Sequence, residues 1–107
     1  MVSVKQLASK LGIPLAYTEG SLELINFAHV DKILTACEEK NIYVLGIEGF
    51  KKDGKSIIPE MDFIADYSAL DDLPLKERSA KSIESARGFF KEAASKPEML
   101  FEFNLKG

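Results

Sequence analysis

The pattern of apolar and polar positions is most informative between residues 42 and 67, where two apolar-rich runs flank Asp53-Gly54. This dipeptide is typical of a β-hairpin turn. The first run, residues 42–47, is almost continuously apolar, which indicates a strand covered on both faces. The second run alternates, as a strand with two different faces does. Its two sides are Met61, Phe63, Ala65 and Tyr67, and Glu60, Asp62, Ile64 and Asp66.

The register of this hairpin decides which side chains share a face, because a slip of one residue moves every side chain to the other face. We predict a three-residue loop, Asp53 to Lys55, which places Ile47 opposite Met61 and Glu48 opposite Glu60. One face is then wholly apolar and the other is mixed and acidic. A two-residue loop would instead oppose Ile47 to Glu60. Burial of each large apolar side chain contributes roughly 1.5–3 kcal/mol, which favours the three-residue loop.

Periodicity elsewhere predicts the remaining elements. Helices are expected at residues 3–11, 27–40 and 73–95, and strands at residues 21–25 and 98–105. Ser3 and Asn26 are suitable N-caps, and Asn41 tolerates the left-handed conformation that often ends a helix. The inner face of the third helix is predicted from its small and apolar positions, which are Ala80, Ile83, Ala86, Phe90 and Ala93. The last strand alternates, with Met99, Phe101, Phe103 and Leu105 against Leu100, Glu102 and Asn104.

The order of these elements predicts one α+β domain spanning residues 1–107, with helices on one face of a mainly antiparallel sheet in two layers. Without the first helix the order is the split β-α-β pattern of ferredoxin-like folds. The segment 21–25 is short; if it is not a strand, a three-stranded sheet with helices remains. The acidic face of the sheet is expected to face solvent.

Composition narrows the classes of function. The chain has 107 residues and a net charge of −3, and this mild acidity argues against direct binding of nucleic acid, which requires a basic patch. The single cysteine, Cys37, cannot form an internal disulfide, which indicates the reducing cytoplasm. No stretch approaches the ~20 apolar residues that cross a bilayer, so no membrane partner is expected. Residues 1–17 resemble neither a signal peptide nor an anchor.

The sequence offers few residues for catalysis. His29 is the only histidine, and no nucleophile or orienting acid lies near it in the sequence. Cys37 lies on the apolar stripe of its predicted helix, where free cysteine behaves as a small buried hydrophobe. One Cys and one His exclude a zinc pattern, and there is no nucleotide-binding glycine motif. We therefore predict no enzyme activity, no cofactor and no metal.

Carboxylates are concentrated after the hairpin turn. Residues 56–75 contain five of them and neither Lys nor Arg. Three interpretations stay open. The first is a solvated sheet face and helix start. The second is a metal or acid–base site, for which Glu48, Glu60 and Asp62 would have to converge. The third is a docking surface for a basic partner, since clustered like charge steers association.

Three segments, VLGIEGF at 44–50, MDFIADYSAL at 61–70 and SARGFFKEA at 85–93, resemble small cytoplasmic immunity proteins of bacterial polymorphic toxin systems, including the contact-dependent inhibition type. The resemblance covers about residues 28–105. It implies a protein that is not an enzyme and that binds and neutralises a cognate toxin domain, often a nuclease with a basic substrate groove. The docking residues expected on the acidic surface are Glu48, Glu60, Asp62, Asp66, Asp71 and Asp72. The alternative is a small ligand-binding or regulatory α+β module that self-associates through its sheet.

Overall fold

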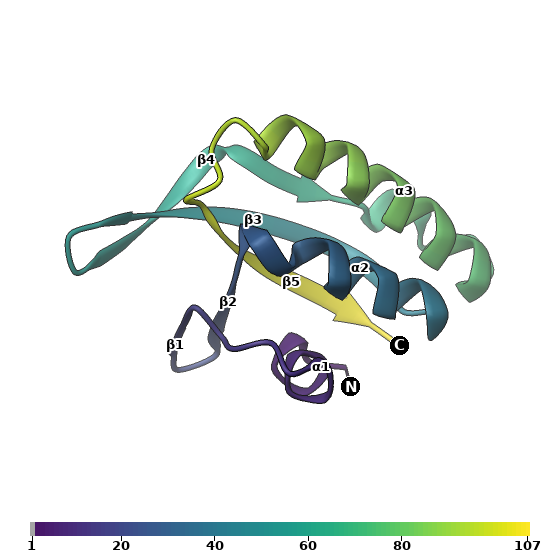
Figure 1. The fold of residues 1–107 in the computed structure, drawn as a ribbon. Helices are drawn as coiled ribbons and strands as arrows, with labels where there is room; N and C mark the ends of the chain where they lie inside the picture. The colour runs from purple at the N-terminus through teal and green to yellow at the C-terminus, as the bar shows by residue number, and fades with distance from the viewer. Residues whose placement is uncertain (1) are drawn as a thin grey trace.

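A computed structural model describes residues 2–107 as an α+β protein in which helices pack against a five-stranded antiparallel sheet (Figure 1). The helices are α1 (Val4–Leu11), α2 (Val30–Glu39) and α3 (Leu75–Ala93), with short 3-10 helices η1 (Phe27–His29) and η2 (Ser68–Leu70). The strands are β1 (Tyr17–Glu19), β2 (Leu22–Asn26), β3 (Tyr43–Asp53), β4 (Ser56–Asp66) and β5 (Leu100–Lys106). The predicted fold class is confirmed. No helix in residues 2–107 is long and apolar enough to cross a membrane.

The sheet has the strand order β1-β2-β5-β3-β4. Both β-α-β units are split as predicted, because β5 lies between β2 and β3, and β3 lies between β5 and β4. The β-α-β-β-α-β set consists of β2, α2, β3, β4, α3 and β5. Its central strands in the sheet are β5 and β3, which are the fourth and the second strands of the set. A ferredoxin-like sheet has the first and third in the centre, so the strand order differs from that arrangement. β1 was not predicted, because only three residues form it and two of them are exposed.

The helix ends predicted at Ser3, Asn26 and Asn41 are confirmed, whereas α3 begins at Leu75 rather than at residue 73 and ends at Ala93 rather than at residue 95. The Ser3 hydroxyl accepts a hydrogen bond of 3.1 Å from the Gln6 amide, and the Asn26 side chain accepts one of 3.0 Å from Ala28. Asn26 caps η1, which leads directly into α2. Asn41 has φ of +53° just after α2, the left-handed conformation that closes a helix.

The main core lies between the sheet and the helices. Phe101 is fully buried at its centre, with its ring centroid 4.9 Å from that of Phe90 and 6.0 Å from that of Phe89, in edge-to-face arrangements. The alternation predicted for β5 is confirmed, since Phe103 and Leu105 are buried on this face. Ala80, predicted on the inner face of α3, is exposed instead. The buried residues near it are two serines, Ser79 and Ser82, that the apolar pattern did not reveal.

The hairpin register differs from the prediction. Asp53 pairs with Ser56 across a two-residue loop that begins at Gly54, whose φ is +60°. Farther along, Glu48 pairs with Ile64, so the register shifts within the hairpin. The prediction assumed one regular ladder, whereas the strands contain bulges that let each half of the hairpin bury its own apolar residues.

The bulge in β4 occupies residues 60–63, which lie opposite the single residue Gly49 between the Phe50–Pro59 and Glu48–Ile64 pairs. A side chain at Gly49 would crowd β4, since an added Cβ would lie 3.0 Å from the Cβ of Phe63 and 3.2 Å from its carbonyl oxygen. The Met99 terminal methyl, at 2.6 Å, is the end of a flexible side chain that can move aside. Met61, predicted on the apolar face, is 73% exposed because the bulge turns it outward.

A second bulge lies in β3, where the pairing with β5 skips Leu45. It brings Val44, which a regular strand would place on the same face as Glu48, into the core beneath the helices. The Val44 amide donates to the buried hydroxyl of Ser82, at 3.1 Å, and that hydroxyl donates to the Ser79 carbonyl. Ser82 on α3 therefore satisfies the amide at the bulge.

A small second cluster lies on the other face of the sheet. It comprises Leu24, Phe50 and Leu100, all buried. Half-buried Tyr17 and Ile57, from β1 and the outer half of the hairpin, pack against it. The face without helices is thus apolar at one end.

Candidate functional site: the open face of the sheet

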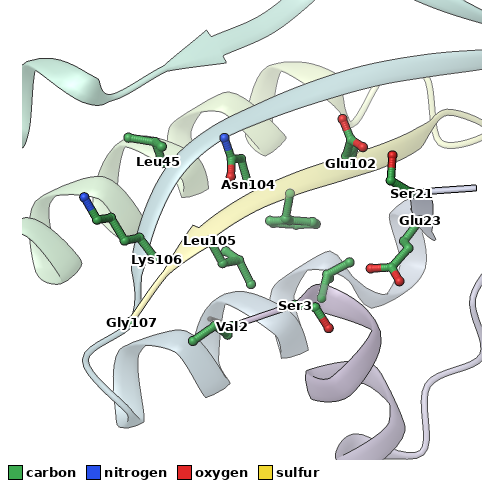
Figure 2. A pocket seen from close by; sticks show the side chains of 12 residues that line it. Val2, Ser3, Ser21, Glu23, Leu45, Glu102, Asn104, Leu105, Lys106 and Gly107 are labelled. Carbon is green, nitrogen blue, oxygen red and sulfur yellow. The ribbon is translucent and has the colours of Figure 1, made fainter.

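Carboxylates lie at the centre of the sheet face that the helices leave open. Glu48 of β3 is directly opposite Glu102 of β5. Both face away from the helices, because their neighbours Ile47 and Phe103 point into the helix-side core. Figure 2 shows Glu102 and Asn104 on one side of β5 and Leu105 on the other. A shallow hollow of about 400 Å³ lies over this region, and Asp66 lines it together with both glutamates.

No ion pair formed within residues 2–107 balances the charges of this group. Among residues 2–107 the ion pairs join Arg87 to Asp31 and Glu38, and Lys96 to Glu60; none involves Glu48 or Glu102. Partial burial raises the pKa of Glu102, and the nearby carboxylates of Glu48 and Glu23 raise it further. Like charges directly opposite each other destabilise a sheet. The arrangement suits a positively charged partner.

Two of the six predicted docking residues lie in this hollow. Glu48 is half-buried at the centre of the sheet, and Asp66 is exposed at the end of β4. Asp66 also has a structural role, since its carboxylate accepts a hydrogen bond of 2.9 Å from the Ser68 amide. This bond holds the pKa of Asp66 below its usual value.

The structure does not bring the other four to the hollow. Glu60 lies on the helix side of the hairpin, where its carboxylate is 4.0 Å from the Lys96 ammonium, which lies over the Phe63 ring. Asp62 is exposed in the bulge of β4. The predicted opposition of Glu48 and Glu60 is therefore wrong, because the bulge reverses the face of the residues before it. Asp71 and Asp72 are exposed in the connector between η2 and α3.

A larger groove adjoins the hollow at β5, with a volume of about 820 Å³ (Figure 2). It lies where β2 and β5 separate, since only Ile25 and Asn26 of β2 pair with β5. Its walls are formed by the start of α1, the start of β2 and the second half of β5. Its walls include Val2, Val4, Ser21, Glu23, Glu102 and Lys106.

The candidate catalytic residues lie elsewhere. Cys37 is fully buried in α2, and burial raises the pKa of its thiol to about 12, so the thiol stays protonated at neutral pH. His29 is half-buried at the end of η1. Within residues 2–107, no group of three or more His, Cys, Asp or Glu residues is arranged to hold a metal ion.

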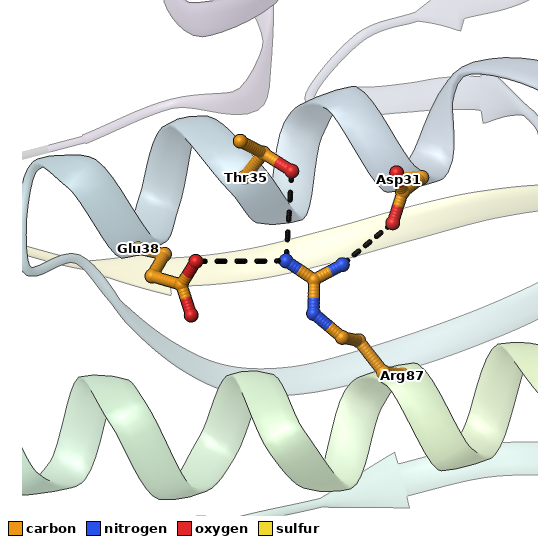
Figure 3. A network of polar contacts seen from close by, with 4 residues as sticks. All are labelled: Asp31, Thr35, Glu38 and Arg87. Atoms are coloured by element: carbon orange, nitrogen blue, oxygen red, sulfur yellow. Dashed lines mark hydrogen bonds and ion pairs between the residues drawn. The ribbon is translucent and has the colours of Figure 1, made fainter.

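A polar network on the helix side has a structural role (Figure 3). Arg87 of α3 lies 2.5 Å from the Asp31 carboxylate and 3.8 Å from that of Glu38, and it contacts the Thr35 hydroxyl at 3.5 Å. All three partners lie on one face of α2, so Arg87 connects the two helices. The network lies outside the open face.

Sequence reasoning missed Glu102 and Glu23 as members of the acidic group. The alternation of the last strand places Glu102 on its polar side, which was the available signal. The missing information was the strand order, because only the pairing of β5 with β3 brings Glu102 beside Glu48. No protein-family profile matches the sequence, and comparison with curated proteins and with solved structures gives no match.

Proposed function

We propose that this protein acts in the bacterial cytoplasm as an immunity protein, which binds and neutralises a cognate toxin domain through the open face of its sheet. It acts by binding rather than by catalysis. The observation that carries the proposal is the cross-strand pair Glu48–Glu102, two like charges held opposite each other with no ion-pair partner among residues 2–107. Basic groups of a partner would relieve this repulsion.

The charge of the partner follows from the same group. Glu48, Asp66 and Glu102 would present negative charge to an approaching basic surface, which raises the association rate constant. A nuclease domain with a basic substrate groove is one such partner, as the sequence resemblance implies. An inhibitor that covers that groove would exclude the nucleic acid from it.

The first experiment identifies the partner. The gene beside this one is expected to encode a large secreted protein with a variable C-terminal domain. That domain, expressed alone in a bacterial host, should stop growth, and co-expression of this protein should restore it. A neighbouring domain that is harmless, or that is equally toxic with this protein present, would overturn the proposal.

The second experiment tests the surface with matched charge changes. The triple variant Glu48→Gln, Asp66→Asn, Glu102→Gln removes three charges from the open face. The control Glu60→Gln, Asp71→Asn, Asp72→Asn removes three elsewhere. The open-face variant should associate with the toxin domain about tenfold more slowly at low salt and with weaker salt dependence. The control should retain the parent rate constant. Equal rate constants for the two variants would place the interface elsewhere.

A further inference from the structure

Strand β5 has a free edge inside the sheet. On one side it pairs with β3 along its whole length, but on the other side only Leu100 and Phe101 have strand partners. From Glu102 to Lys106, the backbone on the β2 side has no strand partner among residues 2–107. Free N–H and C=O groups along a strand edge are the template to which another strand adds.

The groove along this edge has the form of a site for one strand. Its volume of about 820 Å³ is within the range of sites that enclose a single ligand. Five residues of β5, Glu102 to Lys106, span about 17 Å, and an added strand of equal length would lie beside them. Half-buried Val2 gives the groove wall an apolar contact, whereas Val4 and Leu105, which also line it, are almost fully buried.

The charges along the groove select the chemistry of the added strand. Glu102 and Glu23 lie near the end where β2 and β5 separate, and Lys106 lies near the other end. Neither glutamate forms an ion pair among residues 2–107. Glu102, Asn104 and Lys106 share one face of β5, while Phe103 and Leu105 share the other. An occupant should therefore alternate apolar and polar side chains, with a basic residue beside Glu102.

We infer that the groove between β2 and β5 binds an extended segment of a partner protein, which adds to the free edge of β5 as an antiparallel strand and places a basic side chain beside Glu102. The identity of the partner rests on the proposed function, whereas the mode of binding does not. The added strand would adjoin the hollow that contains Glu48, so one partner could contact the groove and the open face together.

A second copy of the chain is the main rival occupant. Antiparallel pairing of two β5 strands about Asn104 would place Glu102 of each copy opposite Lys106 of the other. However, each copy would bring its own groove walls, at Val2 and Ser21, into the space that the other requires. A single strand carries no such walls.

The probe is a designed heptapeptide, TEVTVKK, acetylated and amidated at its ends. Antiparallel to β5, its glutamate lies opposite Lys106, its valines opposite Leu105 and Phe103, and its first lysine opposite Glu102. On binding, the amide resonances of residues 102–106 and 2–4 should shift. Those amides of residues 102–106 that point away from β3 should also become protected from hydrogen exchange.

Control peptides separate backbone pairing from charge. The charge-reversed peptide TKVTVEE should bind about tenfold more weakly, since two exposed ion pairs become repulsive. Two N-methylated versions of TEVTVKK test the backbone hydrogen bonds. One is methylated on both valines, and the other is methylated on the threonine between them and on the glutamate and first lysine that flank them. Because successive backbone amides point to opposite edges of a strand, each version blocks one edge. One of the two should lose binding completely, because one edge must bond to β5. Equal binding of all four peptides would overturn strand addition.

Variants of the protein provide the reciprocal test. The double variant Glu102→Lys, Lys106→Glu should exchange the preference and bind TKVTVEE more tightly than TEVTVKK. Ser21→Trp should fill the groove and abolish peptide binding, while Ser85→Trp, on the exposed face of α3, should leave it intact. A parent protein that sediments as a dimer and loses this state in Ser21→Trp would overturn the inference in favour of a second copy.

The outcomes distinguish this inference from the proposed function, because the peptide assay needs no toxin. Peptides that do not bind, combined with a toxin complex weakened by the open-face triple variant, would overturn strand addition alone. Peptide binding at β5, combined with no protection against the neighbouring domain, would support strand addition and overturn the immunity function.

Discussion

The two faces of the sheet differ in construction, although alternate residues of the same strands supply both. On the helix side, Phe101 is fully buried among the rings of Phe27, Phe89 and Phe90. On the open side, Leu100 belongs to a cluster of only three buried residues, and Glu102 lies opposite another carboxylate. The difference indicates that the helix side contributes most to stability, while the open side retains charges that stability alone would not favour.

The largest expected effect comes from Phe101→Ala, which should lower the free energy of unfolding by about 3–5 kcal/mol, because a central ring is removed. Leu100→Ala, the adjacent residue on the open face, should cost less, about 2–3 kcal/mol, since half-exposed neighbours can close over the gap. Urea denaturation of both variants measures the difference. An equal or larger cost at Leu100 would contradict the ranking of the two faces.

An intermediate effect is expected where the helix layer is tied to the sheet. Ser82→Ala leaves the buried Val44 amide without its acceptor, so the free energy of unfolding should fall by about 1–3 kcal/mol. Ser85→Ala, on the exposed side of the same helix, is the matched control and should change little. If Ser82→Ala matched that control, the hydroxyl would not be needed at the β3 bulge.

The smallest effect should have the opposite sign. Glu102→Gln removes one of two opposed charges and should stabilise the protein at pH 7 by about 0.2–1 kcal/mol, the size of a cross-strand pair effect. Because the pKa of Glu102 is raised on folding, the native state takes up its proton at a higher pH than the unfolded chain. The advantage of the variant should therefore shrink as pH falls through that raised pKa, and vanish below the unfolded value.

Denaturation midpoints of Glu102→Gln and the parent across pH 3.5 to 8 would measure this trend. The exposed Glu98→Gln serves as the charge-matched control for the removal of one carboxylate from the surface. A variant less stable than the parent at pH 7 would indicate that Glu102 has a favourable partner, and the contrast between the two faces would then be lost.

Several features set by local sequence were predicted correctly, although the length of the hairpin loop and the bounds of α3 were not. Ser3, Asn26 and Asn41 cap or close helices through contacts within a few residues, and the alternation of β5 depends on that strand alone. The hairpin register was predicted incorrectly because both bulges depend on packing against residues that are distant in the sequence. One is held by Ser82 of α3, and the other lies at Gly49, where a Cβ would crowd the Cβ and the carbonyl oxygen of Phe63.

The candidate site was predicted only in part for the same reason. Glu48 and Asp66 lie in the hollow, but Glu60 lies on the helix side because the β4 bulge changes which residues alternate. Glu102 and Glu23 could not be assigned to the group without the strand order. An acidic run in the sequence therefore identified the correct hairpin but not the correct set of carboxylates.

The bulge in β4 also bears on aggregation. β4 is an outer strand, and long flat outer strands recruit further chains into growing fibrils. Here Pro59 lacks an amide hydrogen to donate, residues 60–63 interrupt the ladder, and the carboxylates of Asp62 and Asp66 repel a second copy of the same strand. The opposite outer strand, β1, has only three residues and offers little length for such growth. The sheet is thereby protected at both outer margins, and among residues 2–107 its unpaired inner edge lies along the groove beside β5.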